Sequence, residues 1–440
     1  MAYEMDLGFN PASFKGALQE VEFAYNSVPF YKDLLREHSL SPSHFSTPEA
    51  FRKLPLTKKK HYRTNFPAGV LAVGKTLSEK FTLKSQSSGT GGHRLTTISY
   101  TYDLANRMFG SLSVNPPLGQ IVSEFNNKPA RFAAPNCSDV ECASPFSSLS
   151  DRILADGTLV LPVAHDLLTT PKEMIDQAIS ELYDFKPNWL YVDPTHLAFL
   201  VRALKSRSLR APEISGIALT YTLATGVARR QIRDFFGNRI PMAESVSMTE
   251  LGWIAMECTH GNMHVNNKDY YVEFIVDGRP ARSGELAELV VTSIGDRLLP
   301  HLRYATGDIY KVDVRRCSCG SKFPVAHHQG RQESLIAADY DDDIVKPRWV
   351  SPRDIDLVIG EEPTIDIYQL TQTCDKNIVL KYIESGYRKL DVVSLRNRLA
   401  ALFGAHQALS LQAVSYIPAG RSGKFISCLS EYSMENNAYV

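Results

Sequence analysis

The sequence predicts an α/β protein with a large N-terminal domain of layered β-sheets and helices and a small, mobile α+β C-terminal domain. The chain has 440 residues, more than one ordinary domain needs. Short β-rich runs alternate with helical segments from 95 to 330, as expected for layers of sheet and helix. A polar, acidic stretch at 330–345 then interrupts this alternation. We place the boundary there, giving domains 1–331 and 332–440 joined by a hinge-like connection.

The elements can be taken in order along the chain. Apolar positions at helical spacing predict a helix over 11–37, which Pro29 should break or restart. Helical periodicity also marks 171–184 and 195–205 in the large domain and about 390–403 in the small one. Strands are expected at TLVLPV, WLYV, YYVEFIVD and ELVVTS, then at TIDIYQL and NIVLKYI, with a final strand after the last helix.

The charge balance narrows the function class. Lys plus Arg equals Asp plus Glu, 48 each, so neither a nucleic acid nor a membrane surface is an expected partner. The acidic N-terminus is not expected to be a signal peptide, and no apolar run approaches the roughly 20 residues that span a bilayer. The seven scattered cysteines indicate a reducing compartment. We expect a cytoplasmic protein, and a homodimer is left open.

One short stretch, SQSSGTGGHR at 85–94, suggests a binding loop. It lies between two strand-like runs, KFTLKS and LTTISYT. Backbone N–H groups exposed by glycines, with hydroxyl groups beside them, suit a phosphate. No Gly-Lys-Ser/Thr closes the loop, so it is not a Walker A motif. On these residues alone, a plain turn between strands remains the alternative.

Four later stretches connect this loop with a known family. The loop resembles the SSGTTG loop of carboxylate-adenylating enzymes, the superfamily of acyl-CoA synthetases, peptide-synthetase adenylation domains and insect luciferases. SMTE at 247–250, RYATGD at 303–308, GR at 330–331 and RSGK at 421–424 resemble further motifs of that superfamily, in the same order. The segments VEFAYNSVPFYKDLL and FRKLPLTKKKHYRTNFPAG, with MEC at 256–258, look like the phenylacetate–CoA ligase branch.

The resemblance implies a role for each matching residue. Glu250 would hold Mg²⁺ with the phosphates of ATP, and Thr249 would touch the α-phosphate. Asp308 would accept hydrogen bonds from both ribose hydroxyls, and Arg331 would reach the ribose or the phosphates. Lys424 would join the substrate carboxylate to the α-phosphate region, where a cation stabilises developing charge. The phosphate cradle would consist of Ser87, Ser88, Gly89, Thr90, Gly91 and Gly92.

Each role has a simpler alternative. Asp308 could be an exposed turn residue, and the Thr249–Glu250 pair a helix cap. Arg331 could form a surface salt bridge at the hinge, and Lys424 could be a solvated lysine in a flexible loop.

The sequence departs from the family pattern at several positions. Gly91 stands where the family has Thr or Ser, and His93-Arg94 replace Lys-Pro. Val246-Ser247 stand where an aromatic-Gly pair that packs on adenine is usual, and the hinge has Gln332-Glu333-Ser334 in place of an Asp. Nucleotide packing and hinge rotation are therefore expected to differ from the family pattern.

A second group of residues, separate from the ATP motifs, consists of cysteines and histidines that could bind a metal ion. CSCG at 317–320 offers the closely spaced thiols Cys317 and Cys319, and CTHGNMH offers Cys258 with His264, or with His260 in its place. Three thiolates and an imidazole form a tetrahedral set that suits structural Zn²⁺. Ordinary thiols in a turn are the alternative.

The resemblance implies an ATP-dependent ligase. A carboxylic acid, expected to be aryl or arylacetic, would form an acyl-adenylate with release of pyrophosphate, and a thiol, most commonly coenzyme A, would then displace AMP. WLYVDPTHLAFL and ALTYTLATG are expected to line the acid pocket. One alternative is a specialised enzyme of secondary metabolism with an amine or protein acceptor, in which Cys428 could carry the acyl group. Another is a non-catalytic nucleotide-binding relative.

Overall fold

The computed structural model describes residues 7–87, 94–135, 147–338, 347–386, 388–404 and 407–432. Its contacts divide the chain into two compact units, each made of two separate stretches of sequence. Unit 1 comprises Met1–Gly119 and Ser245–His328, and unit 2 comprises Gln120–Glu244 and Gln329–Val440. Residues 329–440 thus group with 120–244, and the domain boundary at 331/332 stays a prediction.

Unit 1 begins with helices whose bounds follow from proline. Pro29 lacks a backbone N–H and has a fixed φ, so the first helix ends before it and a second begins with it, as predicted. Phe14 and Val21 of the first helix pack with Tyr270 and Leu289 in one apolar core. The helices are α1 (Pro11–Ser27), α2 (Pro29–Glu37), α3 (Pro48–Phe51), α4 (Lys59–Asn65), α5 (Thr101–Leu112) and α6 (Pro116–Ser123), which runs past the end of the first stretch.

The strands of unit 1 form a hairpin and a larger sheet. The hairpin pairs β1 (Thr82–Gln86) with β2 (Thr96–Tyr100). In the sheet the order is β11-β10-β12-β13-β14-β9-β8, followed by the second half of β7. The bounds are β7 (Met242–Met248), β8 (Gly252–Glu257), β9 (Met263–Val265), β10 (Tyr270–Val276), β11 (Arg279–Pro280), β12 (Leu286–Ser293), β13 (Tyr304–Asp313) and β14 (Val325–Arg331).

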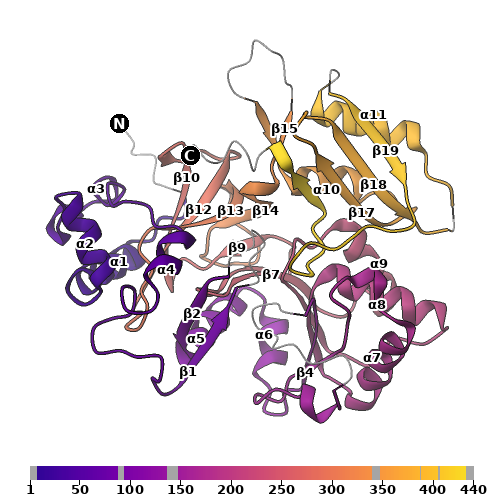
Figure 1. The fold of residues 1–440 in the computed structure, drawn as a ribbon, viewed down its shortest axis with the longest axis horizontal. Coiled ribbons are helices and arrows are strands. Elements are labelled where there is room, and N and C mark those ends of the chain that lie inside the picture. Colours follow the sequence, from indigo (N-terminus) through magenta and orange to yellow (C-terminus); the bar gives the residue numbers. More distant parts are fainter. Residues whose placement is uncertain are drawn as a thin grey trace. The chain divides into compact units, whose positions relative to one another are not determined.

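Unit 2 contains a parallel sheet in the order β7-β6-β5-β3-β4. Three amphipathic helices lie beside it, and apolar residues of α7 and α8 share a core with the strands (Figure 1). The strands are β3 (Pro129–Phe132), β4 (Leu159–Val160), β5 (Trp189–Val192) and β6 (Gly216–Leu219), and the helices are α7 (Lys172–Phe185), α8 (Pro194–Ser206) and α9 (Gly226–Phe236).

The C-terminal stretch of unit 2 adds a sheet in the order β19-β18-β17-β20, with α11 against it (Figure 1). The predicted helix near 390–403 is confirmed, and the single expected final strand is two strands, β19 and β20. The elements are β15 (Ile336–Ala338), β16 (Arg348–Val350), α10 (Pro352–Ile359), β17 (Ile365–Gln372), β18 (Ile378–Glu384), α11 (Val392–Phe403), β19 (Leu409–Ala413) and β20 (Cys428–Ser430). Among the described residues, none of the helices has the length and apolarity to cross a membrane.

Candidate active site and metal cluster

The glycine loop connects the two strands of the β1–β2 hairpin, so its predicted strand neighbours are confirmed. Ser87 is 5% exposed and closes the base of the loop. Its backbone N–H donates to the Leu95 carbonyl at 2.8 Å, and the Leu95 N–H donates to the Ser87 Oγ at 2.9 Å. The other predicted cradle residues, Ser88, Gly89, Thr90, Gly91 and Gly92, lie outside the described residues.

Two of the predicted motifs meet at Glu250. This residue follows β7 directly after Thr249 and is 6% exposed. The Tyr304 hydroxyl, from RYATGD, donates to Glu250 Oε1 at 2.5 Å. Burial opposes ionisation of Glu250, but the charge of Lys59 and the Tyr304 hydrogen bond outweigh it and lower the pKa of this carboxyl. Glu250 is therefore a carboxylate at neutral pH, which is the form that a hard cation binds.

Asp308 belongs to the middle of strand β13 and is 4% exposed. Its backbone N–H donates to the Thr306 Oγ1 at 3.1 Å, and the Thr306 hydroxyl donates to the Leu289 carbonyl at 2.7 Å. His328 Nε2 of β14 lies 3.9 Å from Asp308 Oδ1. The alternative of an exposed turn residue is therefore wrong: Asp308 is held in a strand.

Lys424 lies in unit 2, where its Nζ donates to the Tyr221 carbonyl at 3.3 Å. Tyr221 belongs to ALTYTLATG, one of the stretches expected to line the acid pocket. Gly423, just before the lysine, has φ +76°, and a Cβ there would lie 2.9 Å from the His165 carbonyl and 3.1 Å from Ala134 Cβ. These contacts with the 120–244 stretch of unit 2 disfavour the alternative of a solvated lysine in a flexible loop.

Arg331 is the last residue of β14 and is exposed. It also belongs to unit 2, whereas Glu250 and Asp308 belong to unit 1. Sequence reasoning missed the partners of two of these groups: the Tyr304 hydroxyl on Glu250 and the Tyr221 carbonyl on Lys424. Tyr304 belongs to the RYATGD motif, so its side chain could have been predicted as a partner from the sequence. A backbone carbonyl such as that of Tyr221 leaves no signal in the sequence, because every residue has one.

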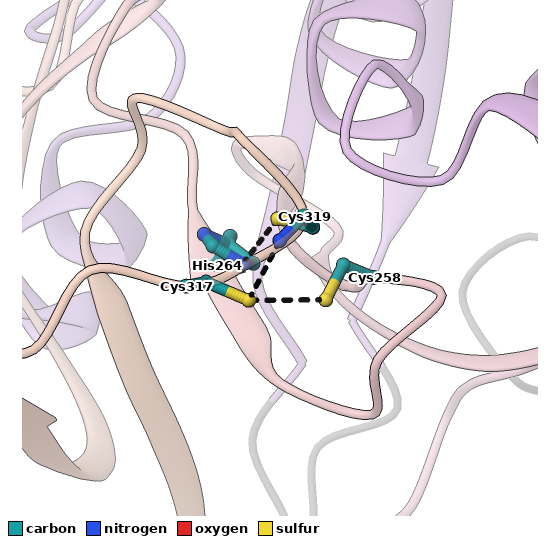
Figure 2. A group of neighbouring side chains, drawn as sticks. All are labelled: Cys258, His264, Cys317 and Cys319. Carbon is teal, nitrogen blue, oxygen red and sulfur yellow. Dashed lines mark hydrogen bonds between the residues drawn. The ribbon is translucent and has the colours of Figure 1, made fainter.

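The predicted metal ligands converge in unit 1 (Figure 2). The ligand atoms of Cys258, His264, Cys317 and Cys319 all lie within 4.8 Å of one another. Cys258 Sγ and Cys317 Sγ are 3.8 Å apart, and Cys319 Sγ is 3.3 Å from His264 Nε2. Two thiolates bound to one Zn²⁺ at about 2.3 Å would stand about 3.8 Å apart in a tetrahedron. The four side chains therefore form a possible metal site with tetrahedral spacing.

Backbone and amide N–H groups point at the sulfurs of this cluster. The Cys319 N–H donates to Cys317 Sγ at 3.5 Å, the Asn262 amide donates to the same sulfur at 3.3 Å, and the His260 N–H donates to Cys258 Sγ at 3.4 Å. Burial opposes ionisation of the Cys317 thiol, but hydrogen bonds from the Cys319 N–H, His264, the Cys319 thiol and Asn262 outweigh it and lower its pKa to about 6. Burial raises the pKa of Cys258 to about 11, so of these two thiols Cys317 ionises more readily.

The structure distinguishes the two candidate histidines. The His264 Nδ1 lies 2.9 Å from the Phe323 carbonyl, which orients Nε2 toward the sulfurs, as outer-shell partners of metal-binding histidines do. His260 is exposed and contributes its backbone N–H rather than its ring.

Cys428 lies in β20 and is 1% exposed. Burial raises the pKa of its thiol well above the ordinary value. A buried neutral thiol is a poor nucleophile, so the structure disfavours Cys428 as an acyl carrier.

Comparison with solved structures identifies the fold. The fold is that of adenylate-forming enzymes: it superposes on 2-hydroxyisobutyryl-CoA ligase in complex with 2-HIB-AMP with a TM-score of 0.72, covering 97% of this chain and 90% of that one at 16% identity. No family model matches the chain.

The chain is also similar to curated relatives that share one name. The chain is 26% identical to the phenylacetate-coenzyme A ligase of Thermus thermophilus over 337 residues, 73% of this chain and 71% of the relative. It is 23% identical to the enzyme of the same name from Pseudomonas putida over 429 residues, 89% of this chain and 88% of the relative. The resemblance to the phenylacetate–CoA ligase-like branch is confirmed.

Proposed function

We propose that this protein is an AMP-forming acid–thiol ligase. In the first half-reaction a carboxylate oxygen of the substrate attacks the α-phosphorus of ATP, and the bond to pyrophosphate breaks. In the second, the thiol of coenzyme A attacks the acyl carbon and AMP leaves with the former carboxylate oxygen. The fold and the names of the curated relatives both support this chemistry.

The observation that carries the proposal is the docking of Lys424 on the loop after β6. A lysine in a turn would ordinarily extend into water, but this one reaches a backbone carbonyl of a segment expected to line the acid pocket. A fixed cation there would offset the charge that builds up on the α-phosphate. We assign Glu250 to Mg²⁺, Thr249 to the α-phosphate, Asp308 to the ribose, Arg331 to the ribose or phosphates, and residues 87–92 to the phosphate cradle.

We propose an aryl or arylacetic acid as substrate. The rings of Tyr191 and Tyr221, from the two stretches expected to line the acid pocket, lie 5.4 Å apart in an edge-on arrangement, and Tyr221 is the residue whose carbonyl receives Lys424. Aromatic side chains suit a planar apolar ligand. The curated relatives are named for phenylacetate.

We assign Zn²⁺ to the cluster of Cys258, His264, Cys317 and Cys319. All four positions of a tetrahedral ion would be filled by protein, which is typical of a structural rather than a catalytic ion. The ion would tie β9 and the turn after Cys258 to the loop between β13 and β14.

Pyrophosphate release over a panel of aryl, alkyl and amino acids, with and without coenzyme A, tests the proposal. We expect acid-dependent release that is greatest with a benzoate- or phenylacetate-type acid, and a thioester when coenzyme A is added. Preferential release with palmitate would contradict the proposed substrate class, and an amide formed in place of the thioester would contradict the proposed acceptor.

A further inference from the structure

Loop 220–226 runs from the end of β6 to the first residue of α9 and is held at three points by the C-terminal stretch of unit 2. Lys424 donates to the Tyr221 carbonyl at 3.3 Å. Arg353, in the first turn of α10, donates from its Nη1 to the Ala224 carbonyl at 2.8 Å. Asp356, one turn further along, accepts the Gly226 N–H at 2.9 Å to each of its carboxylate oxygens.

A buried carboxylate joins these contacts. Glu244 Oε1 accepts the Ala224 N–H at 3.1 Å, and its Oε2 accepts both Arg229 and Arg353 at 2.7 Å. Glu244 and Asp356 are each 3% exposed. The Arg353 guanidinium is thus forked: one nitrogen reaches the loop and the other reaches the carboxylate that holds the same loop.

Such a cluster fixes geometry more clearly than it adds stability. A buried ion pair loses much of its Coulombic gain to desolvation, so its presence alone is weak evidence for a stabilising role. A guanidinium with two bonded partners does, however, define distance and direction, which a point charge does not. Here the Arg353 guanidinium sets the position of loop 220–226, and this loop contacts Lys424.

A second arginine also connects the two stretches of unit 2. Arg230, on the second turn of α9, donates to the carbonyls of Gly360, Glu362 and Ile365 at 2.6, 2.8 and 3.1 Å. It links the same two parts of unit 2, and none of these contacts falls on 220–226.

We propose that Arg353 and Asp356 are positioning residues for adenylate formation: they hold loop 220–226 where the Tyr221 carbonyl receives Lys424. This inference rests on the proposed function, because it assumes that Lys424 serves the adenylation step. The two residues contact the loop and not the reacting atoms, so they act through Lys424 and Tyr221.

The test compares Arg353→Lys with Arg230→Lys. Each variant keeps the positive charge and loses the planar guanidinium group with its two donor nitrogens. Only Arg353→Lys changes the contacts of loop 220–226. A displacement of about 1 Å can cost up to about 100-fold in rate. We therefore expect Arg353→Lys to lower kcat for acid-dependent ATP–pyrophosphate exchange about 10- to 100-fold, and Arg230→Lys to change it less than about twofold. Transfer from a pre-made acyl-adenylate to coenzyme A should stay within about twofold in both variants.

The double variant Arg353→Lys/Lys424→Ala provides the readout that a merely structural role would not give. If Arg353 acts through Lys424, the double variant should exchange no more slowly than Lys424→Ala alone. Equal losses in Arg353→Lys and Arg230→Lys, or additive losses in the double variant, would overturn the inference while leaving the proposed function intact. Absence of acid-dependent exchange in the wild-type protein would overturn both.

Discussion

Lys424 reaches the Tyr221 carbonyl because the residue before it is a glycine. At Gly423 the backbone has φ +76°, a conformation that residues other than glycine rarely adopt. The loop also lies against His165 with no room for a Cβ. The hydroxyl of Tyr416 also donates to Asp166, on the segment that follows β4. The glycine at 423 and the Tyr416–Asp166 hydrogen bond therefore both help to fix the position of the Lys424 ammonium group.

Replacing Lys424 with alanine should separate the two half-reactions. Loss of one fixed charge contact to the reacting phosphate typically costs about 10²- to 10³-fold, so adenylation should fall by this factor. Transfer of the acyl group from a supplied adenylate has no comparable need of the lysine and should be nearly unchanged. Single-turnover assays of each half-reaction measure this, with the exposed Lys381→Ala as control. Equal loss in both half-reactions would mean that Lys424 is structural.

Gly423→Ala should reproduce much of the Lys424→Ala defect with the lysine still present. The added methyl group would meet the His165 carbonyl at 2.9 Å, so the loop must move. Gly386→Ala is the matched control, because Gly386 has the same φ of +76° but nothing within 4 Å of an added Cβ. We expect adenylation to drop at least about tenfold in the first variant only. If the two variants behave alike, backbone strain rather than docking is responsible.

His301 should make stability depend on pH. It is fully buried, and neither ring nitrogen has a hydrogen-bond partner among the described residues. Burial lowers its pKa to about 4, although Asp296 and Glu250 act in the opposite direction. The unfolded chain takes up the proton near pH 6.5, so the folded state loses up to about 3 kcal/mol as the pH falls from about 6.5 to about 4.

The variant His301→Phe isolates this effect, since it keeps a ring stacked on Tyr62, whose centroid is 4.5 Å from that of His301. Chemical unfolding at several pH values should show a flatter profile for His301→Phe than for the wild-type protein. The exposed His38→Gln serves as control. Superimposable profiles for wild type and His301→Phe would show that the histidine is not neutral in the folded protein.

At the scale of elements, the sequence predicted strands and helices best where periodicity and proline coincide. The WLYV strand and the break at Pro29 are confirmed. TLVLPV is a strand only at Leu159–Val160. SPRDIDLVI, which we did not assign, is helix α10: Ser351 and Asp354 form a capping box, a local signal that was present in the sequence.

The metal cluster shows what spacing can and cannot determine. The two cysteine motifs predicted that four ligands would converge, and they do. The choice between His260 and His264 could not be made from spacing, because it depends on β9, which pairs His264 with Val325 of β14 and Met256 of β8. Sheet register of this kind arises from contacts distant in sequence.

We expect one tightly bound Zn²⁺ per chain. Cys317→Ser should lose the metal and lower the free energy of unfolding by about 3 kcal/mol or more, as expected when a structural metal site is removed. The exposed Cys374→Ser should do neither. Elemental analysis and thermal unfolding of the three proteins measure this. A metal-free wild-type protein, or full zinc content in Cys317→Ser, would contradict the assignment.

At the scale of the whole molecule, the order of the motifs was the most informative feature of the sequence. Five short matches from 85 to 424 indicated the fold class, which the structural comparison confirms. The grouping of residues 329–440 with 120–244 did not follow from the acidic stretch at 330–345. It depends on contacts such as Arg353 with Glu244 and Arg230 with three carbonyls, whose partners lie more than 100 residues apart.

The exchange of radiolabelled pyrophosphate into ATP, measured with the wild-type protein at saturating Mg²⁺, is the most direct test of acyl-adenylate formation by this protein. It reports formation of the acyl-adenylate and needs no acceptor. We expect exchange that requires a carboxylic acid, is fastest with a benzoate- or phenylacetate-type acid, and proceeds without coenzyme A. Absence of exchange with every acid of the aryl, alkyl and amino acid panel, from protein that is folded and zinc-loaded, would contradict this expectation.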